Sequence, residues 1–237
     1  MRTISLFLST ILFTSCINII STQKFAEGPI EERTLPLTEA VRSIAISSGA
    51  DVIVDPTLPA NEIRVTTHSD IFDILDIYAY NDELNIGLTS NLLRAKTFEV
   101  RIPILAYKDI AISGGSDFAW DNCVAEELSI AASGGADVDI TSNSSTINLA
   151  ISGGADAEIS GRCITLNVAA SGGADADLDE LMAENVNVSA SGGADVEVYA
   201  TKSLTVHASG GSDVAFRGNP EKKDIERSGG ADVYVND

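Results

Sequence analysis

Basic residues, aromatic residues and histidines are all scarce in this sequence. Lys and Arg number 15 against 35 Asp and Glu, so the net charge is −20. An excess of negative charge this large argues against binding to nucleic acid and against electrostatic attachment to anionic lipid. The two histidines, His68 and His207, lack the Cys, His or Glu spacings of a zinc site. Aromatic residues make up 5% of the chain, which indicates a thin core of small and β-branched side chains.

The sequence is rich in one repeated pentapeptide, Ser-Gly-Gly-Ala-Asp or its variant Ser-Gly-Gly-Ser-Asp. Successive copies begin 20, 19, 19, 20, 18 and 19 residues apart. A nearly fixed period of this length is typical of repeat proteins in which each unit stacks on its neighbours. The seven copies begin at Ser113, Ser133, Ser152, Ser171, Ser191, Ser209 and Ser228.

The residues between the copies alternate between apolar and polar. After the corner that begins at Ser133, Val138 and Ile140 alternate with aspartates, and before the next copy Leu149 and Ile151 alternate with Asn148 and Ala150. This period of two predicts two short strands per unit, one on each side of the glycine pair. A unit of 19 residues leaves no room for a crossover helix. We therefore predict an all-β fold, a parallel β-solenoid whose rungs lie about 4.8 Å apart, with glycines at one corner because they adopt strained backbone conformations cheaply.

Outward residues of a solenoid form columns, and one column here is acidic throughout. We expect each aspartate to accept hydrogen bonds from nearby backbone N–H groups, which would stabilise its charged form. The alternative is a row of calcium sites, because Gly-Gly-x-x-Asp partly matches the calcium-binding nonapeptide repeat. The column consists of Asp117, Asp137, Asp156, Asp175, Asp195, Asp213 and Asp232, and a second acidic column consists of Asp139, Glu158, Asp177 and Glu197.

A second outward column contains amides. Asn148, Asn167 and Asn187 stand at the same offset in consecutive units. Asn side chains in register are able to hydrogen-bond along a stack of strands, so we expect a ladder that stiffens the solenoid.

The N-terminus has the pattern of an exported lipoprotein. Residues 1–15 contain Arg2 followed by an apolar stretch and small residues directly before Cys16, which is typical of a signal peptide. The segment Leu12–Cys16 resembles a bacterial lipobox, and this resemblance implies lipid attachment at Cys16. We expect an exported, lipid-anchored protein, located at the outer membrane, with residues 16–34 as a tether. The sequence leaves open whether the periplasmic or the surface face holds it.

The other cysteines, Cys123 and Cys163, occupy similar offsets two rungs apart. Stacking would separate their Cα atoms by about 9 to 10 Å, beyond the reach of a disulfide. We predict two free thiols.

Residues 35–237 are expected to form the solenoid domain, with 35–110 as an N-terminal cap with degenerate rungs and 111–237 as the regular repeats. Ser47–Asp51 is a degenerate eighth copy of the pentapeptide. Strands are expected around 63–66, 76–80, 83–88 and 98–102, with a hairpin turn at Asn81–Asp82 and a single helical turn within 71–75. Phe118 and Trp120 share the inward phase and are expected in the core.

This pattern resembles the putative auto-transporter adhesin, head GIN domain family of envelope proteins from Bacteroidetes. The resemblance covers roughly residues 35–237 and rests on the hairpin Tyr78–Ile86, the pentapeptide copies, and the segment Phe216–Pro220. It implies a right-handed β-solenoid on the cell envelope and no catalytic residues.

We therefore expect a non-enzymatic protein, anchored in the membrane, with an adhesin-like binding or structural role and no cofactor. Its ligand would be an envelope polysaccharide or a protein. Two alternatives remain: a polysaccharide-degrading β-solenoid enzyme with paired carboxylates, and a calcium-dependent adhesion module. Arg217, Lys222 and Lys223 form a basic cluster that is either a solvated loop or a partner-binding lip. Because the last copy ends close to the C-terminus, the open solenoid end is expected to favour weak self-association.

Overall fold

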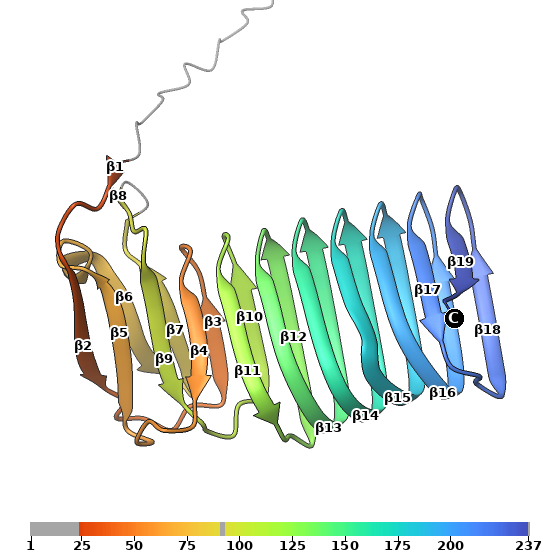
Figure 1. The fold of residues 1–237 in the computed structure, drawn as a ribbon, viewed down its shortest axis with the longest axis horizontal. Coiled ribbons are helices and arrows are strands. Elements are labelled where there is room, and N and C mark those ends of the chain that lie inside the picture. The colour runs from red at the N-terminus through yellow and green to blue at the C-terminus, as the bar shows by residue number, and fades with distance from the viewer. Residues whose placement is uncertain (1–23, 91–92, 237) are drawn as a thin grey trace, which may run out of the picture.

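The chain folds as an elongated parallel β-solenoid of about 7 turns. A computed structural model describes residues 24–90 and 93–236. The predicted signal peptide and the predicted lipid-attachment residue Cys16 lie outside the described residues. Figure 1 shows the strands stacked side by side, from the N-terminal cap at the left to the last rung at the right. The predicted fold class is confirmed.

Each regular rung contributes one strand segment to each of two sheets. The segment after the glycine corner pairs only with equivalent segments, as does the segment before the next corner; for example, Asp137 pairs with Asp156 and Asn148 pairs with Asn167. These rungs comprise β10 (Asp109–Ser113), β11 (Asp117–Cys123), β12 (Glu127–Gly134), β13 (Asp137–Gly153), β14 (Asp156–Gly172), β15 (Asp175–Gly192), β16 (Asp195–Ala208), β17 (Asp213–Arg217), β18 (Lys222–Arg227) and β19 (Asp232–Val235).

The corner opposite the glycine pair differs from the prediction of two separate strands. β13, β14 and β15 are continuous strands of 17, 17 and 18 residues, and the pairing of β13 with β14 continues through the bend from Thr141 to Ser144. Gly161 has a φ of 111° at this bend, and a Cβ there would overlap the backbone of Ser142. The buried hydroxyls of Ser142 and Ser144 bond to each other at 2.7 Å. The chain therefore bends here without breaking its ladder of hydrogen bonds.

The core is a thin column of inward side chains between the two sheets. Phe118 and Trp120 are buried, as predicted, at 1% and 3% exposure. The Trp120 ring meets Tyr107 edge to face with centroids 5.8 Å apart, and the Tyr107 hydroxyl donates to the Pro103 carbonyl at 2.8 Å. These rings belong to a core that consists mainly of Val, Ile, Leu and Ala.

Both described cysteines are free thiols, as expected. Cys163 pairs in register with Ser144 of β13, and Cys123 of β11 pairs with Ser142 of the same strand. β13 therefore lies between the two cysteines. Burial raises the pKa of Cys163 to about 12.

The N-terminal cap stacks its rungs in an order that differs from the chain order. β3 (Ser43–Ile46) and β4 (Asp51–Asp55) form the rung next to β10 and β11, whereas β7 (Glu83–Leu88) and β9 (Phe98–Pro103) form the rung beyond it. The chain thus runs outward, builds the cap, and returns past the β3–β4 rung to begin the regular repeats. The sequence pattern did not predict this order.

Antiparallel strands close the cap. β5 (Glu62–His68) pairs with β9 and with β2 (Ile30–Pro36), and β6 (Leu75–Tyr80) forms a hairpin with β7. A 3-10 turn at Phe72–Ile74 precedes β6, while β1 (Lys24–Phe25) pairs with β8 (Leu93–Arg94). The predicted strands, hairpin and helical turn are confirmed.

The prediction for the degenerate copy of the pentapeptide is confirmed, whereas the prediction for the tether is wrong in part. Asp51 pairs in register with Asp117, so the eighth copy of the pentapeptide is a true rung corner. The tether was expected to extend to residue 34, but β2 pairs all seven of its residues with β5. That part of the prediction is wrong, because Ile30 and Leu35 belong to a strand whose partner comes later in the chain.

The last rung has charged side chains where other rungs have core residues. Lys223 pairs with Leu204 and Arg227 pairs with Ala208, both of which are buried. Charged residues in the inward phase of an edge strand hinder its pairing with another chain. Within the described part of the chain, no helix is long and apolar enough to cross a membrane.

Candidate functional site

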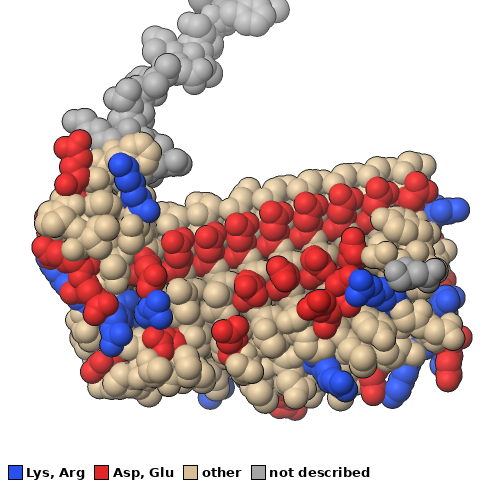
Figure 2. Space-filling model, viewed as in Figure 1, with Lys and Arg blue, Asp and Glu red and all other residues tan. Residues whose placement is uncertain are grey.

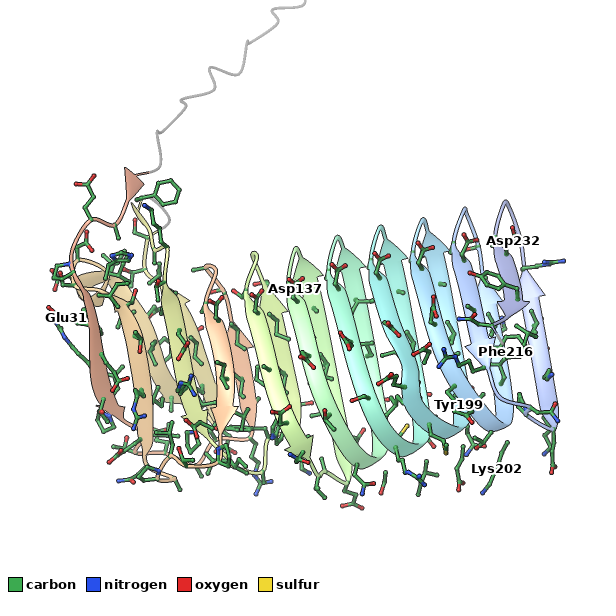
Figure 3. The ribbon with its side chains drawn as sticks, in the orientation of Figure 1. Glu31, Asp137, Tyr199, Lys202, Phe216 and Asp232 are labelled. Carbon is green, nitrogen blue, oxygen red and sulfur yellow. The ribbon has the colours of Figure 1, made fainter. Side chains whose placement is uncertain are left out.

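The two sheets present outward surfaces of opposite character. The acidic face is the outward surface of the segments that follow the glycine corners. Figure 2 shows two rows of carboxylates running along it, and Figure 3 places Asp137 and Asp232 in the upper row. This row is a ladder in register, made of Glu99, Asp51, Asp117, Asp137, Asp156, Asp175, Asp195, Asp213 and Asp232.

The surroundings of the ladder destabilise the charged form of several of its carboxylates. The pKa values of Asp51, Asp117, Asp156 and Asp195 are raised, first by partial burial and then by neighbouring carboxylates. A hydrogen bond from a backbone N–H group would lower the pKa, but no such bond contributes to these four shifts. The prediction that these four aspartates cap their corners is therefore wrong. At one corner the cap is Ser116 instead, whose hydroxyl accepts from the N–H groups of Gly49 and Ala50 at 3.1 and 3.2 Å.

Three carboxylates of the acidic face converge on one spot. Among the described residues, Asp177, Asp179 and Glu197 form a group in which one carboxylate oxygen from each residue lies within 4.8 Å of the other two. Burial and Asp177 raise the pKa of Asp179. Arg217 contacts Asp179 at 3.0 Å and the Asn236 amide donates to Glu197 at 3.0 Å, so polar partners already hold two of the three carboxylates.

This convergence differs from the predicted calcium column, since none of its seven aspartates belongs to the group. Asp177 and Glu197 belong to the second acidic column, and Asp179 was not singled out from the sequence. Asp179 reaches the group because the register between β15 and β16 shifts between Leu178 and Met182. The 20-residue spacing that begins at Ser171 is the one sequence signal of this irregularity.

The neutral face is the outward surface of the segments that precede the glycine corners in β13 to β16. The flanking strands β12 and β18 carry charged residues in the same columns, among them Glu127 and Glu226. The amide ladder of the neutral face is confirmed: Asn187 donates to Asn167 and Asn167 donates to Asn148, both at 2.8 Å. Asn148 in turn donates to Ser129 at 3.4 Å and to Glu127 at 3.1 Å.

A shallow groove runs along the neutral face across the rungs. It has a volume of about 660 Å³, and Ala150 and Ala169 lie between the amide column on one side and the repeat serines on the other. The groove continues toward the cap past Ala111 and Ala131, where Asp109 and Glu83 also line it. Small side chains in the middle column make this hollow, because taller residues flank it.

The remaining predicted residues do not assemble a site. His207 is exposed on the neutral face and lies 3.1 Å from Glu226. The basic cluster is divided: Arg217 binds Asp179, while Lys223 lies over the ring of Phe216 at 5.4 Å from its centroid. Figure 3 labels Phe216 near the C-terminal end.

The chain belongs to the family described as putative auto-transporter adhesin, head GIN domain, whose model matches residues 41–220. The fold resembles that of a putative adhesin from Bacteroides fragilis, with a TM-score of 0.81 and 17% identity over 90% of this chain and 99% of the other. A putative adhesin from Parabacteroides merdae gives 0.71 and 13%, with 90% and 98% covered.

A third similar structure, from Parabacteroides distasonis, is described as a putative lipid binding protein. It has a TM-score of 0.69 and 15% identity, with 90% of this chain and 99% of the other covered. Likeness at this level of identity establishes the shared fold. No curated protein matches this chain.

Proposed function

We propose that this protein is a non-enzymatic, lipid-anchored protein of the cell envelope that holds an adhesin-like binding surface away from the membrane. The observation that carries the proposal is the regularity of the rungs. From β13 to β16 similar residue types recur at most of the paired positions, so these rungs offer rows of similar groups. Membership of an adhesin family supports the same function.

The enzymatic alternative lacks support from the geometry. Glycosidases place two carboxylates across a cleft that holds the substrate. In the described part of the chain, the converging carboxylates Asp177, Asp179 and Glu197 lie within 4.8 Å of one another on an outward surface. They lie side by side on that surface, Asp177 and Asp179 on β15 and Glu197 on β16, and do not face each other across a cleft.

Lipid attachment at Cys16 is tested by growing cells with labelled palmitate and separating their membranes. The wild-type chain is expected to carry the label and to sediment with the outer membrane. Cys16→Ser should lose the label and become soluble. A soluble, unlabelled wild-type chain would remove the anchor from the proposal.

Binding is tested with beads coated with residues 17–237. Beads that carry the folded protein should adhere to the cell envelope or to the material that surrounds the cells. Beads coated with a heat-unfolded sample should not adhere. Equal adhesion of both samples would remove the adhesin role and leave a structural one.

A calcium-dependent form of this function would place the ion at the group Asp177, Asp179 and Glu197. Carboxylate oxygens are the ligands that calcium takes in proteins. Thermal unfolding with a chelator and with millimolar calcium tests it, since a bound ion raises the midpoint of unfolding by mass action.

A further inference from the structure

We propose that the neutral face is a binding site for a linear, uncharged polysaccharide, which lies along the groove parallel to the solenoid axis. The inference rests on the proposed binding function and names its ligand class and its site.

The chemistry of this face is unlike that of the rest of the molecule. On a chain with a net charge of −20, four consecutive rungs expose hydroxyl, amide and small side chains with no carboxylate, lysine or arginine among them. The outward residues are Thr146, Asn148, Ala150, Ser152, Thr165, Asn167, Ala169, Ser171, Asn185, Asn187, Ser189, Ser191, Ser203, Thr205, His207 and Ser209.

The acidic face of the same rungs gives the contrast. There Asp137 and Asp139 of β13, Asp156 and Glu158 of β14, and their equivalents in β15 and β16 stand in register. A cationic ligand would therefore bind the acidic face, and the net charge would repel an anionic one. The charge distribution leaves an uncharged ligand as the partner of the neutral face.

The hydrogen-bonding groups of the neutral face are held in place before a ligand arrives. Along the ladder, Asn167 donates one N–H to Asn148 and accepts one from Asn187. An amide has two N–H groups and two acceptor sites, so Asn167 keeps one donor and one acceptor for a ligand. Fixing these groups in the free protein lowers the entropy cost of binding.

The groove has the shape for an extended, hydroxyl-bearing chain. Its floor of Ala150 and Ala169 accepts the flat apolar side of a sugar ring, while amides and hydroxyls along both edges face the sugar hydroxyls. Its volume of about 660 Å³ lies within the usual range of about 300 to 1,000 Å³ for ligand sites. Because β13 and β14 present the same Thr, Asn and Ala in register, two successive sugars would meet the same partners there.

The size of the face argues against a second copy of this chain as its main occupant. Four rungs of seven residues cover roughly 19 Å by 23 Å, or on the order of 440 Å². A stable protein interface buries about 800 Å² on each partner. A narrow polymer needs only the groove.

Native gel electrophoresis through gels containing a polysaccharide tests this, because the acidic chain migrates readily. The gels contain pullulan, laminarin or yeast mannan as uncharged probes, and polygalacturonate as a charged one. At least one uncharged polysaccharide should retard the protein, while polygalacturonate should not.

Two variants locate the site. Ala169→Lys places a long charged side chain on the exposed floor of the groove, and Asn167→Ala breaks the amide ladder; each should weaken retardation about tenfold or more. Thr141→Lys adds the same charge to the acidic face of the neighbouring rung and should retain wild-type binding. Circular dichroism and melting confirm that each variant is folded, and Asn167→Ala is decisive if Ala169→Lys does not fold.

Each contrary outcome has a distinct meaning. Absence of retardation by every uncharged probe overturns the inference, and if coated beads still adhere, the proposed function survives with a different ligand. If the Asn167→Ala variant is retarded as strongly as the wild type, the binding site does not lie on the neutral face. Two other occupants are recognised when no polysaccharide binds. If Ala169→Lys abolishes a dimer of the wild-type chain, the occupant is a second copy; if it abolishes binding to phospholipid vesicles, the occupant is a lipid surface.

Discussion

At the glycine corners from Ser133 onward, only the first glycine of each pair has a positive φ. Gly192 has a φ of 79°, and a Cβ there would lie 2.9 Å from the Gly172 carbonyl oxygen. Its neighbour Gly193 lies outside the left-handed region, and a Cβ there would meet its nearest atom at 3.7 Å. The first glycine of the pair is thus required by the stacked backbone, and the second is not.

We expect Gly192→Ala to destabilise the protein by about 1–3 kcal/mol, since alanine is strained at positive φ and its methyl would push on the rung below. Gly193→Ala is the matched control and should be neutral or stabilise by about 0.4–1 kcal/mol, because alanine restricts the unfolded chain. Urea unfolding measures both. Equal losses in the two variants would contradict this account.

The thiols provide a second prediction for single residues. Burial raises the pKa of Cys163 to about 12 and also raises that of Cys123, and the reactive form of a cysteine is the thiolate. In the Cys16→Ser protein at pH 8, Ellman's reagent should modify neither thiol until denaturant is added. Fast modification of the folded protein would show that the rungs open locally.

At the scale of the sheet, the raised pKa values of the acidic ladder predict how the stability of the protein depends on pH. Because the pKa of Asp156 is raised above 3.8 by burial and by Asp175 and Asp137, the folded chain binds protons where the unfolded chain has released them. Stability should therefore rise as the pH falls from 7 toward about 4. Asp156→Asn should raise the melting midpoint at pH 7 and reduce its dependence on pH.

Asp55 provides a control, because its pKa is shifted in the opposite direction to that of Asp156. Bonds from the Thr57 N–H and hydroxyl, at 2.8 and 2.6 Å, and a contact with Arg101 lower its pKa. Its stabilising contribution is present above its ordinary pKa of 3.8 and is lost as the pH falls below that value. Asp55→Asn should lower the midpoint at pH 7. A midpoint that falls steadily from pH 7 to 5 in the wild type would contradict the effect of the ladder.

At the scale of the whole molecule, the terminal rung decides whether copies associate. The open end favours end-to-end contact, while Lys223 and Arg227 in the inward phase oppose it. We predict weak self-association of the wild type in sedimentation experiments. The double variant Lys223→Val and Arg227→Val should associate at concentrations at least about tenfold lower, because it completes the apolar column. If the double variant stays monomeric, something other than these two charges prevents association at this end of the solenoid.

The sequence by itself determined the solenoid. The period of about 19 residues, the alternation around Ile140 and Leu149, and the glycine corners each depend on local geometry, and stacking repeats that geometry along the chain. The same regularity determined the amide ladder, the burial of Trp120 and the free thiols, since residues at equal offsets must lie in register.

Only the tertiary structure decided which groups depart from that regularity. Pairings between distant segments place the β3–β4 rung between β7–β9 and β10–β11, and no local pattern records them. The register shift in β15 brings Asp179 to Asp177 and Glu197, and the raised pKa values of the ladder follow from the burial and spacing of whole rungs. The neutrality of one face against the acidity of the other is present in the sequence, but it becomes a surface only when the rungs stack.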